Sequence, residues 1–129
     1  MIDYTDSVED ITSEMLTGFF EGWKKPRTPE EHLRILRNSD HVILALDRER
    51  TRVVGFITAL TDHVQSAFIP LLEVLPEYRG QGIGSALVAR MLTKLEGIPA
   101  TDLICDPSLR SFYARFGMVA TAGMSIRSD

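Results

Sequence analysis

The chain has 129 residues, of which 44% are hydrophobic and 25% charged, and its formal net charge is −4. This length predicts a single domain over residues 1–129, and the acidic balance excludes the basic surface of a nucleic-acid-binding protein. No apolar run is long enough to cross a bilayer, so we expect no membrane partner. Cys105 is the only cysteine, which excludes an internal disulfide and favours a reducing, cytoplasmic location.

The first third of the chain predicts two helices. Apolar residues recur at helical spacing over residues 10–22, which indicates a first helix there. The segment TPEE at residues 28–31 has the order of a capping box, with threonine at the cap, proline in the first turn and glutamate closing the box. We expect this second helix to end near Asn38.

The middle of the chain predicts strands joined by polar turns. HVILAL at residues 41–46, VVGFITAL at 53–60 and AFIPLLEVL at 67–75 are short runs rich in apolar and β-branched side chains. A short strand is also expected at the N-terminus. Pro70 lies inside the third run, and because proline lacks an N–H group we expect an irregular or unpaired stretch there.

The last third alternates again between helices and strands. A helix is predicted over residues 83–95, then a strand at 101–105, a short helix over 106–117 that Asp106 caps, and closing strands at 118–121 and 124–127. The expected fold class is therefore α/β (α+β), with a mixed, largely antiparallel central sheet of six to seven strands flanked by about four helices.

The turn before the helix at 83–95 is rich in glycine, in the stretch LLEVLPEYRGQGIGSAL. N–H groups in the first turn of a helix have no intrahelical partner, and the helix dipole makes that end attractive to a phosphate. Gly80, Gly82 and Gly84 leave room for a ligand to approach the backbone, and Arg79 adds a positive charge. The same glycines also suit a tight strand–helix junction that binds nothing. The spacing fits neither the dinucleotide fingerprint nor the P-loop.

Two motifs carry a resemblance to a known family. The glycine turn reads Arg-x-x-Gly-x-Gly after Val74-Leu75-Pro76, and FYARFGM follows at residues 112–118. In both segments and in their order, the sequence resembles the GNAT superfamily of acetyl-CoA-dependent N-acetyltransferases. The resemblance implies the acyl-CoA N-acyltransferase fold and acetyl-CoA (coenzyme A) as the cofactor, and no metal site is expected.

The resemblance also implies which residues contact the coenzyme. Its diphosphate would lie on the backbone of the glycine turn, and its pantetheine arm along the preceding strand. Mapped residue by residue, the coenzyme-binding set is Leu72, Glu73, Val74, Arg79, Gly80, Gln81, Gly82, Ile83, Gly84, Ser85 and Tyr113.

Two residues are candidates for acid–base catalysis. Tyr113 occupies the tyrosine position of the family motif, which implies a general acid that protonates the departing thiolate; the alternative is that it only fills the core. Glu73 is the candidate general base, because it stands beside the expected acetyl position. The alternative for Glu73 is a carboxylate facing solvent or paired with an arginine.

The acceptor is less well defined by the sequence. Phe20 and Trp23 are candidates for substrate binding, although aromatic residues at helical spacing also suit a core. We expect an N-acetyltransferase that acts on a primary amine of a small molecule or peptide, by direct transfer in a ternary complex. The alternative is a non-catalytic module that binds or senses acyl-CoA. Either a monomer or a homodimer is compatible with the sequence.

Overall fold

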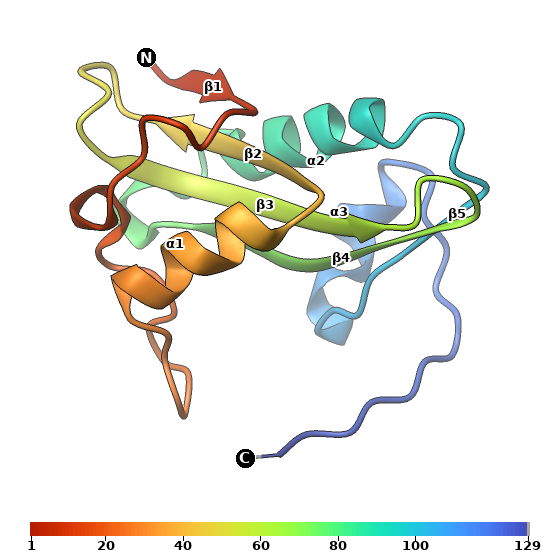
Figure 1. Ribbon diagram of the computed structural model, residues 1–129. Coiled ribbons are helices and arrows are strands. Elements are labelled where there is room, and N and C mark those ends of the chain that lie inside the picture. The colour runs from red at the N-terminus through yellow and green to blue at the C-terminus, as the bar shows by residue number, and fades with distance from the viewer. Residues whose placement is uncertain (129) are drawn as a thin grey trace.

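The computed structural model describes residues 1–128, which form one mixed sheet with helices on both faces (Figure 1). The strands follow one another across the sheet in chain order: β1 (Asp3–Thr5), β2 (His41–Leu46), β3 (Val53–Thr61), β4 (Ser66–Val74) and β5 (Ala100–Asp102). Neighbouring strands are antiparallel except β4 and β5, which are parallel. The helices are α1 (Pro29–Asn38) on one face, with α2 (Ile83–Lys94) and α3 (Arg110–Ala114) on the other.

The predicted fold class is confirmed, but the counts of elements were too high. Over residues 1–128 the sheet has five strands instead of six or seven, and there are three α-helices instead of about four. The predicted closing strands at 118–121 and 124–127 are wrong, because residues 118–128 pair with no strand and leave Val119, Met124 and Ile126 exposed. No helix within residues 1–128 is long and apolar enough to cross a membrane.

The predicted helix over residues 10–22 is also wrong. Only a short 3₁₀ helix, Ser13–Leu16, forms in this segment. Gly18, Phe20 and Gly22 have φ angles of 96°, 66° and 85°, in the left-handed region that a right-handed helix cannot contain. Ile11, Leu16, Phe19 and Phe20 are nevertheless buried and Met15 is partly buried, so the hydrophobic spacing reflects a folded loop that packs onto the sheet.

The capping box that begins α1 is confirmed. The Glu31 N–H donates to Thr28 Oγ1 at 3.1 Å, and the Thr28 N–H donates to Glu31 Oε1 at 2.9 Å. These two bonds satisfy donors that would otherwise lack a partner at the helix start. The inner face of α1 then places His32 and Leu36 in the core, where they are almost completely buried.

The irregularity expected at Pro70 is confirmed and shapes the sheet. The β3–β4 register shifts between Thr58 and Leu60, so that two residues of β4, Ile69 and Pro70, lie opposite one residue of β3. On the other side of β4, pairing with β5 ends at Phe68. The second half of β4 is therefore bonded to β3 only, and its other edge is open.

Candidate active site

The glycine turn lies between β4 and α2, as the sequence predicted. A 3₁₀ turn, Pro76–Tyr78, leads into it, and Gly82 is the N-cap of α2 with no side chain capping the helix. The Ala86 N–H makes the first backbone bond into the helix, to Gly82 O at 3.0 Å. The N–H groups of residues 83–85 therefore have no intrahelical acceptor and lie at the positive end of the helix dipole. This end of α2 can bind an anion.

Two of the three glycines are required by backbone conformation. Gly80 and Gly82 have φ angles of 76° and 83°, and a Cβ at either position would meet no atom within 4 Å. Gly84 does not have a left-handed φ, and a Cβ there would be 3.7 Å from Phe112 Cζ. The turn is thus open on its outer side, where a ligand would approach.

Two arginines lie near this turn, in different roles. Arg79 folds back onto the strand, and its Nε donates to Val74 O at 3.0 Å. Arg115 reaches across from the segment after α3 and donates from Nη2 to Ser85 Oγ at 2.9 Å, with its guanidinium 5.0 Å from the Phe112 ring centre. Arg115 was not among the predicted site residues, since this contact joins segments that are distant in sequence.

The open edge of β4 presents backbone groups that no strand satisfies. The Leu75 N–H donates to Val54 O of β3 at 2.9 Å, and backbone groups of successive strand residues point to opposite sides. The N–H and C=O groups of Leu72 and Val74 therefore point away from β3. Arg79 occupies the Val74 carbonyl, which leaves the Leu72 groups and the Val74 N–H for an extended ligand that contains amides.

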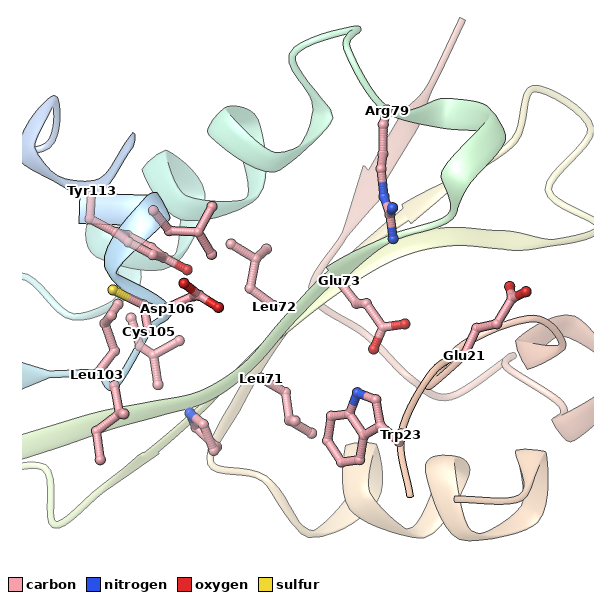
Figure 2. Close-up of a pocket in the computed structure, with 14 residues that line it drawn as sticks. Glu21, Trp23, Leu71, Leu72, Glu73, Arg79, Leu103, Cys105, Asp106 and Tyr113 are labelled. Atoms are coloured by element: carbon pink, nitrogen blue, oxygen red, sulfur yellow. The ribbon is translucent and has the colours of Figure 1, made fainter. Parts of the chain in front are cut away.

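A cavity of about 440 Å³ follows this edge (Figure 2). In Figure 2, β4 runs between two groups of side chains, with Tyr113, Cys105 and Asp106 on one side and Glu73, Trp23 and Glu21 on the other. The full lining consists of Glu21, Trp23, Ile69, Pro70, Leu71, Leu72, Glu73, Arg79, Leu103, Ile104, Cys105, Asp106, Leu109 and Tyr113.

Glu73 is half-buried in the cavity wall, and its carboxylate is fixed by the backbone. The Phe20 N–H donates to Glu73 Oε1 at 2.8 Å. Burial raises the pKa of Glu73, while the bond from Phe20 and the charge of Arg79 lower it in part. A carboxylate with a raised pKa accepts a proton at neutral pH more readily than a solvated one. The left-handed backbone of Phe20 is part of the loop geometry that makes this contact.

Tyr113 lies across β4 from Glu73, on α3, and is 9% exposed. Burial raises the pKa of the Tyr113 phenol, and the nearby Cys105 adds to the rise. The phenol is therefore protonated at neutral pH and can donate a proton into the cavity. Asp106 caps the segment before α3, as expected, by accepting a hydrogen bond from the Ser108 N–H at 3.3 Å.

The structure separates the two predicted acceptor residues. The Phe20 side chain is 1% exposed and does not line the cavity; its ring packs 6.0 Å from that of Phe56 in the core. Trp23 lines the cavity and is 48% exposed. Glu21, on the same loop, also lines the cavity and was not among the predicted site residues. The sequence shows that residue 21 is a glutamate, but whether it faces the cavity depends on the left-handed backbone of the residues on either side of it.

A second hollow, of about 560 Å³, lies between β1 and α2. Its charged groups are already partnered within the chain: Arg90 stacks 4.4 Å from the Tyr4 ring centre, and Lys94 pairs with Asp6. This hollow is larger than the cavity beside β4, but it faces the second half of α2 and not the N-terminus of that helix with its unpaired N–H groups. The cavity beside β4 is the better candidate active site.

Comparison with known proteins agrees with the geometry. Residues 8–118 match the family model described as Acetyltransferase (GNAT) family. The uncharacterized N-acetyltransferase ycf52 of Gracilaria tenuistipitata var. liui is 29% identical over 76% of this chain and 56% of its own length. The histone acetyltransferase TAP1 of Glycine max is 29% identical over 77% of this chain and 47% of its own length. The chain spans about half the length of these curated relatives.

Solved structures give the same result for the fold. The crystal structure of a candidate acetyltransferase from Deinococcus radiodurans R1 superimposes with a TM-score of 0.94 and 40% sequence identity. The match covers 98% of this chain and 87% of that chain.

Proposed function

Since the chain belongs to the GNAT acetyltransferase family, we propose that it transfers the acetyl group of acetyl-CoA to a primary amine by direct transfer in a ternary complex. One observation carries the proposal: β4 has an open edge, the glycine turn joins this strand to the uncapped N-terminus of α2, and Glu73 and Tyr113 both line the cavity beside the edge. A reducing location such as the cytoplasm is proposed with it, because Cys105 is a free thiol in the same wall.

The residues present fit coenzyme A. The N–H groups of residues 83–85 and the guanidinium of Arg115 would hold its phosphates, because within residues 1–128 none of these donors has an acidic partner. The unpaired groups of Leu72 and Val74 would bond the amides of its pantetheine arm. When bound, acetyl-CoA supplies an activated acetyl thioester.

The residues of the chain then supply proton transfer. Glu73 accepts a proton from the acceptor ammonium, directly or through water, so that the neutral nitrogen can form a bond to the acetyl carbon. Tyr113 would give its phenolic proton to the leaving sulfur as the carbon–sulfur bond breaks. The resulting phenolate would take, through water, the second proton that the acylated nitrogen loses, and Glu73 would return its proton to solvent. An N–H at the open edge of β4 can stabilise the charge that develops on the acetyl oxygen.

The proposal is tested with acetyl-CoA and a panel of amines. Acetyl-CoA should raise the melting temperature of the protein, because a ligand that binds only the folded state stabilises it. Release of free CoA in the presence of an amine distinguishes an enzyme from a module that only binds acyl-CoA. Binding without amine-dependent release would favour the binding module, and no thermal shift would exclude both.

Variants test the two assigned roles. Tyr113→Phe should lower kcat by about 10²-fold while acetyl-CoA still stabilises the protein, because a phenylalanine cannot protonate the sulfur. Glu73→Gln should lower kcat and remove the acid limb of the pH profile. Tyr4→Phe and Glu96→Gln, which lie outside the cavity, are the matched controls. Full activity in Tyr113→Phe would contradict the assignment of the acid.

A further inference from the structure

The acceptor side of the cavity has an unusual charge balance. Among the lining residues that the structure describes, the charged side chains on this side are the carboxylates of Glu21 and Glu73 and the guanidinium of Arg79, with no lysine or histidine. Asp106 lies on the other side of β4. Arg79 donates from Nε to Val74 O and keeps its positive charge, so two carboxylates share this side of the cavity with one guanidinium. This side of the cavity thus presents negative charge to an incoming molecule.

Trp23 adds an aromatic surface beside these carboxylates. Its ring is 48% exposed, and it meets the buried Phe20 ring edge-on, with ring centres 5.0 Å apart and an interplanar angle of 71°. Phe20 is held in turn by the core and by its bond to Glu73. A large aromatic ring that is supported from beneath and open to a cavity can bind a cation on its free face.

Glu21 is separated from Trp23 by Gly22 and is exposed at the same mouth. Within residues 1–128 its carboxylate makes neither a hydrogen bond nor an ion pair, in contrast to Glu31 and Glu77, which pair with arginines. Phe20 and Gly22, on either side of Glu21, both have left-handed backbones, which fixes the path of the loop past the cavity. The backbone therefore places Glu21 at the cavity mouth, and its carboxylate is available to a cation there.

These observations lead to a substrate class, which rests on the proposed function. We propose that the acceptor is a small aliphatic diamine: one nitrogen is deprotonated at Glu73 and acetylated, while the second remains an ammonium ion held by Glu21 and the face of Trp23. An alkylammonium has a pKa near that of lysine, about 10.4, so the second nitrogen keeps its charge at neutral pH. The proton and acetyl balance is that of the proposed reaction, and the second nitrogen does not react.

The same surface discriminates against acidic acceptors. An amine that carries a carboxylate or phosphate in place of the second ammonium would bring a further negative charge beside Glu21, on a side of the cavity where carboxylates already outnumber the one guanidinium of Arg79. The order of preference should be diamine, then monoamine, then amino acid of equal chain length.

The experiment compares kcat/KM for a short series of alkyl diamines, alkylamines and ω-amino acids, with CoA release as the readout. We expect diamines to exceed monoamines of equal length by roughly five- to ten-fold, as an ion pair with added cation–π contact would give. Glu21→Gln and Trp23→Leu should each shrink this ratio, chiefly through the KM for the diamine. Glu96→Gln, which removes an equivalent charge away from the cavity, should leave the ratio unchanged.

Calorimetry provides a second measurement that does not need turnover. A diamine should bind the CoA-loaded protein, and Glu21→Gln should weaken that binding. A diamine-to-monoamine ratio near one, an unchanged ratio in Glu21→Gln, or no binding of any diamine to the CoA-loaded protein would each overturn the inference. In the first two cases amines are still acetylated, so the proposed function stands; if acetyl-CoA itself fails to bind, the proposed function fails first.

Discussion

At the scale of single residues, His32 combines complete burial with an unusual lack of partners. Its ring lies among Phe19, Phe20 and Phe56, with ring centres 4.3 Å from Phe56 and 4.9 Å from Phe20. Neither ring nitrogen has a hydrogen-bond partner within residues 1–128. A buried polar group without a partner costs stability, and a charged one would cost more. Burial therefore lowers the pKa of His32 to about 4.

This lowered pKa predicts a pH dependence of stability. Below pH 6.5, the ordinary value, the unfolded chain binds a proton at His32 that the folded chain refuses until about pH 4. The free energy of unfolding should thus fall by about 3 kcal/mol between these limits from His32 alone. His32→Leu should flatten this part of the curve in urea denaturation at a series of pH values.

The matched control is Leu36→Ala, which removes a buried side chain of the same face of α1 that cannot titrate and should lower stability at every pH. It should keep the wild-type slope between pH 6.5 and 4. If His32→Leu and wild type lose stability in parallel over this range, burial of an uncharged histidine is not the cause.

At the scale of elements, Gly82 and Gly84 at the start of α2 allow two reasons for a glycine to be compared, namely a left-handed backbone and lack of space for a side chain. Gly82→Ala places a side chain on a left-handed residue, which costs about 1–2 kcal/mol. Gly84→Ala adds a methyl group at an ordinary contact distance of 3.7 Å from Phe112, inside the first turn of the helix, where alanine is favoured over glycine. We therefore expect Gly82→Ala to lower the free energy of unfolding and Gly84→Ala to leave it equal or slightly higher.

Urea unfolding measures both effects, and the acetyl-CoA-induced thermal shift shows whether the turn still binds. Gly82→Ala should reduce this shift, because the strained turn displaces the N–H groups that follow it. Equal losses of stability in the two variants would mean that crowding, and not backbone conformation, determines the need for glycine here.

The elements also show how far the sequence alone could predict the fold. The strands β2, β3 and β4 and the helices α1 and α2 are encoded by local patterns, namely short apolar runs, a capping box and helical spacing, and all five were predicted. The loop over residues 10–22 was predicted wrongly as a helix. Its apolar residues have the spacing of a helix, but three residues with left-handed φ angles prevent one from forming. The closing strands at 118–121 and 124–127 were predicted but do not form, because the strand propensity of a segment does not show whether a neighbouring strand is available to pair with it.

The candidate site was partly accessible to the same reasoning. The glycine turn, Glu73 and Tyr113 belong to contiguous motifs and lie beside the cavity or at its end, although their roles are still proposals. The contacts from Phe20 to Glu73 and from Arg115 to Ser85 span 53 and 30 residues. No local pattern encodes such pairs, and they emerge only when the loop and α3 pack onto the sheet.

At the scale of the whole molecule, the open edge of β4 predicts a pattern of amide hydrogen exchange. In the free protein, the amides of Leu72 and Val74 should exchange faster than that of Leu75, which is bonded to Val54 O. Acetyl-CoA should slow exchange at Leu72 and Val74 if its arm bonds this edge. Mass spectrometry or NMR with and without the coenzyme measures this.

Amides in the middle of β2, such as that of Leu44, serve as the internal reference, because their strand pairs on both sides in either state. Protection that appears throughout the sheet would indicate global stabilisation instead of an added strand-like ligand. Protection only at residues 83–85 would mean that the coenzyme binds the turn but leaves the edge free.

Pro70 affects whether the open edge of β4 can pair with another copy of the protein. An unsatisfied strand edge invites neighbouring chains to add a strand, which is a common route to aggregation. Pro70 has no N–H to offer, the bulge beside it breaks the register, and Arg79 covers the next free carbonyl after Leu72. The edge therefore offers an added polypeptide strand too few consecutive hydrogen-bonding groups. A thinner, flexible chain with amides, such as the pantetheine arm, needs only two or three such bonds. The irregularity at Pro70 that leaves this edge open to a ligand therefore also hinders strand addition by another protein chain.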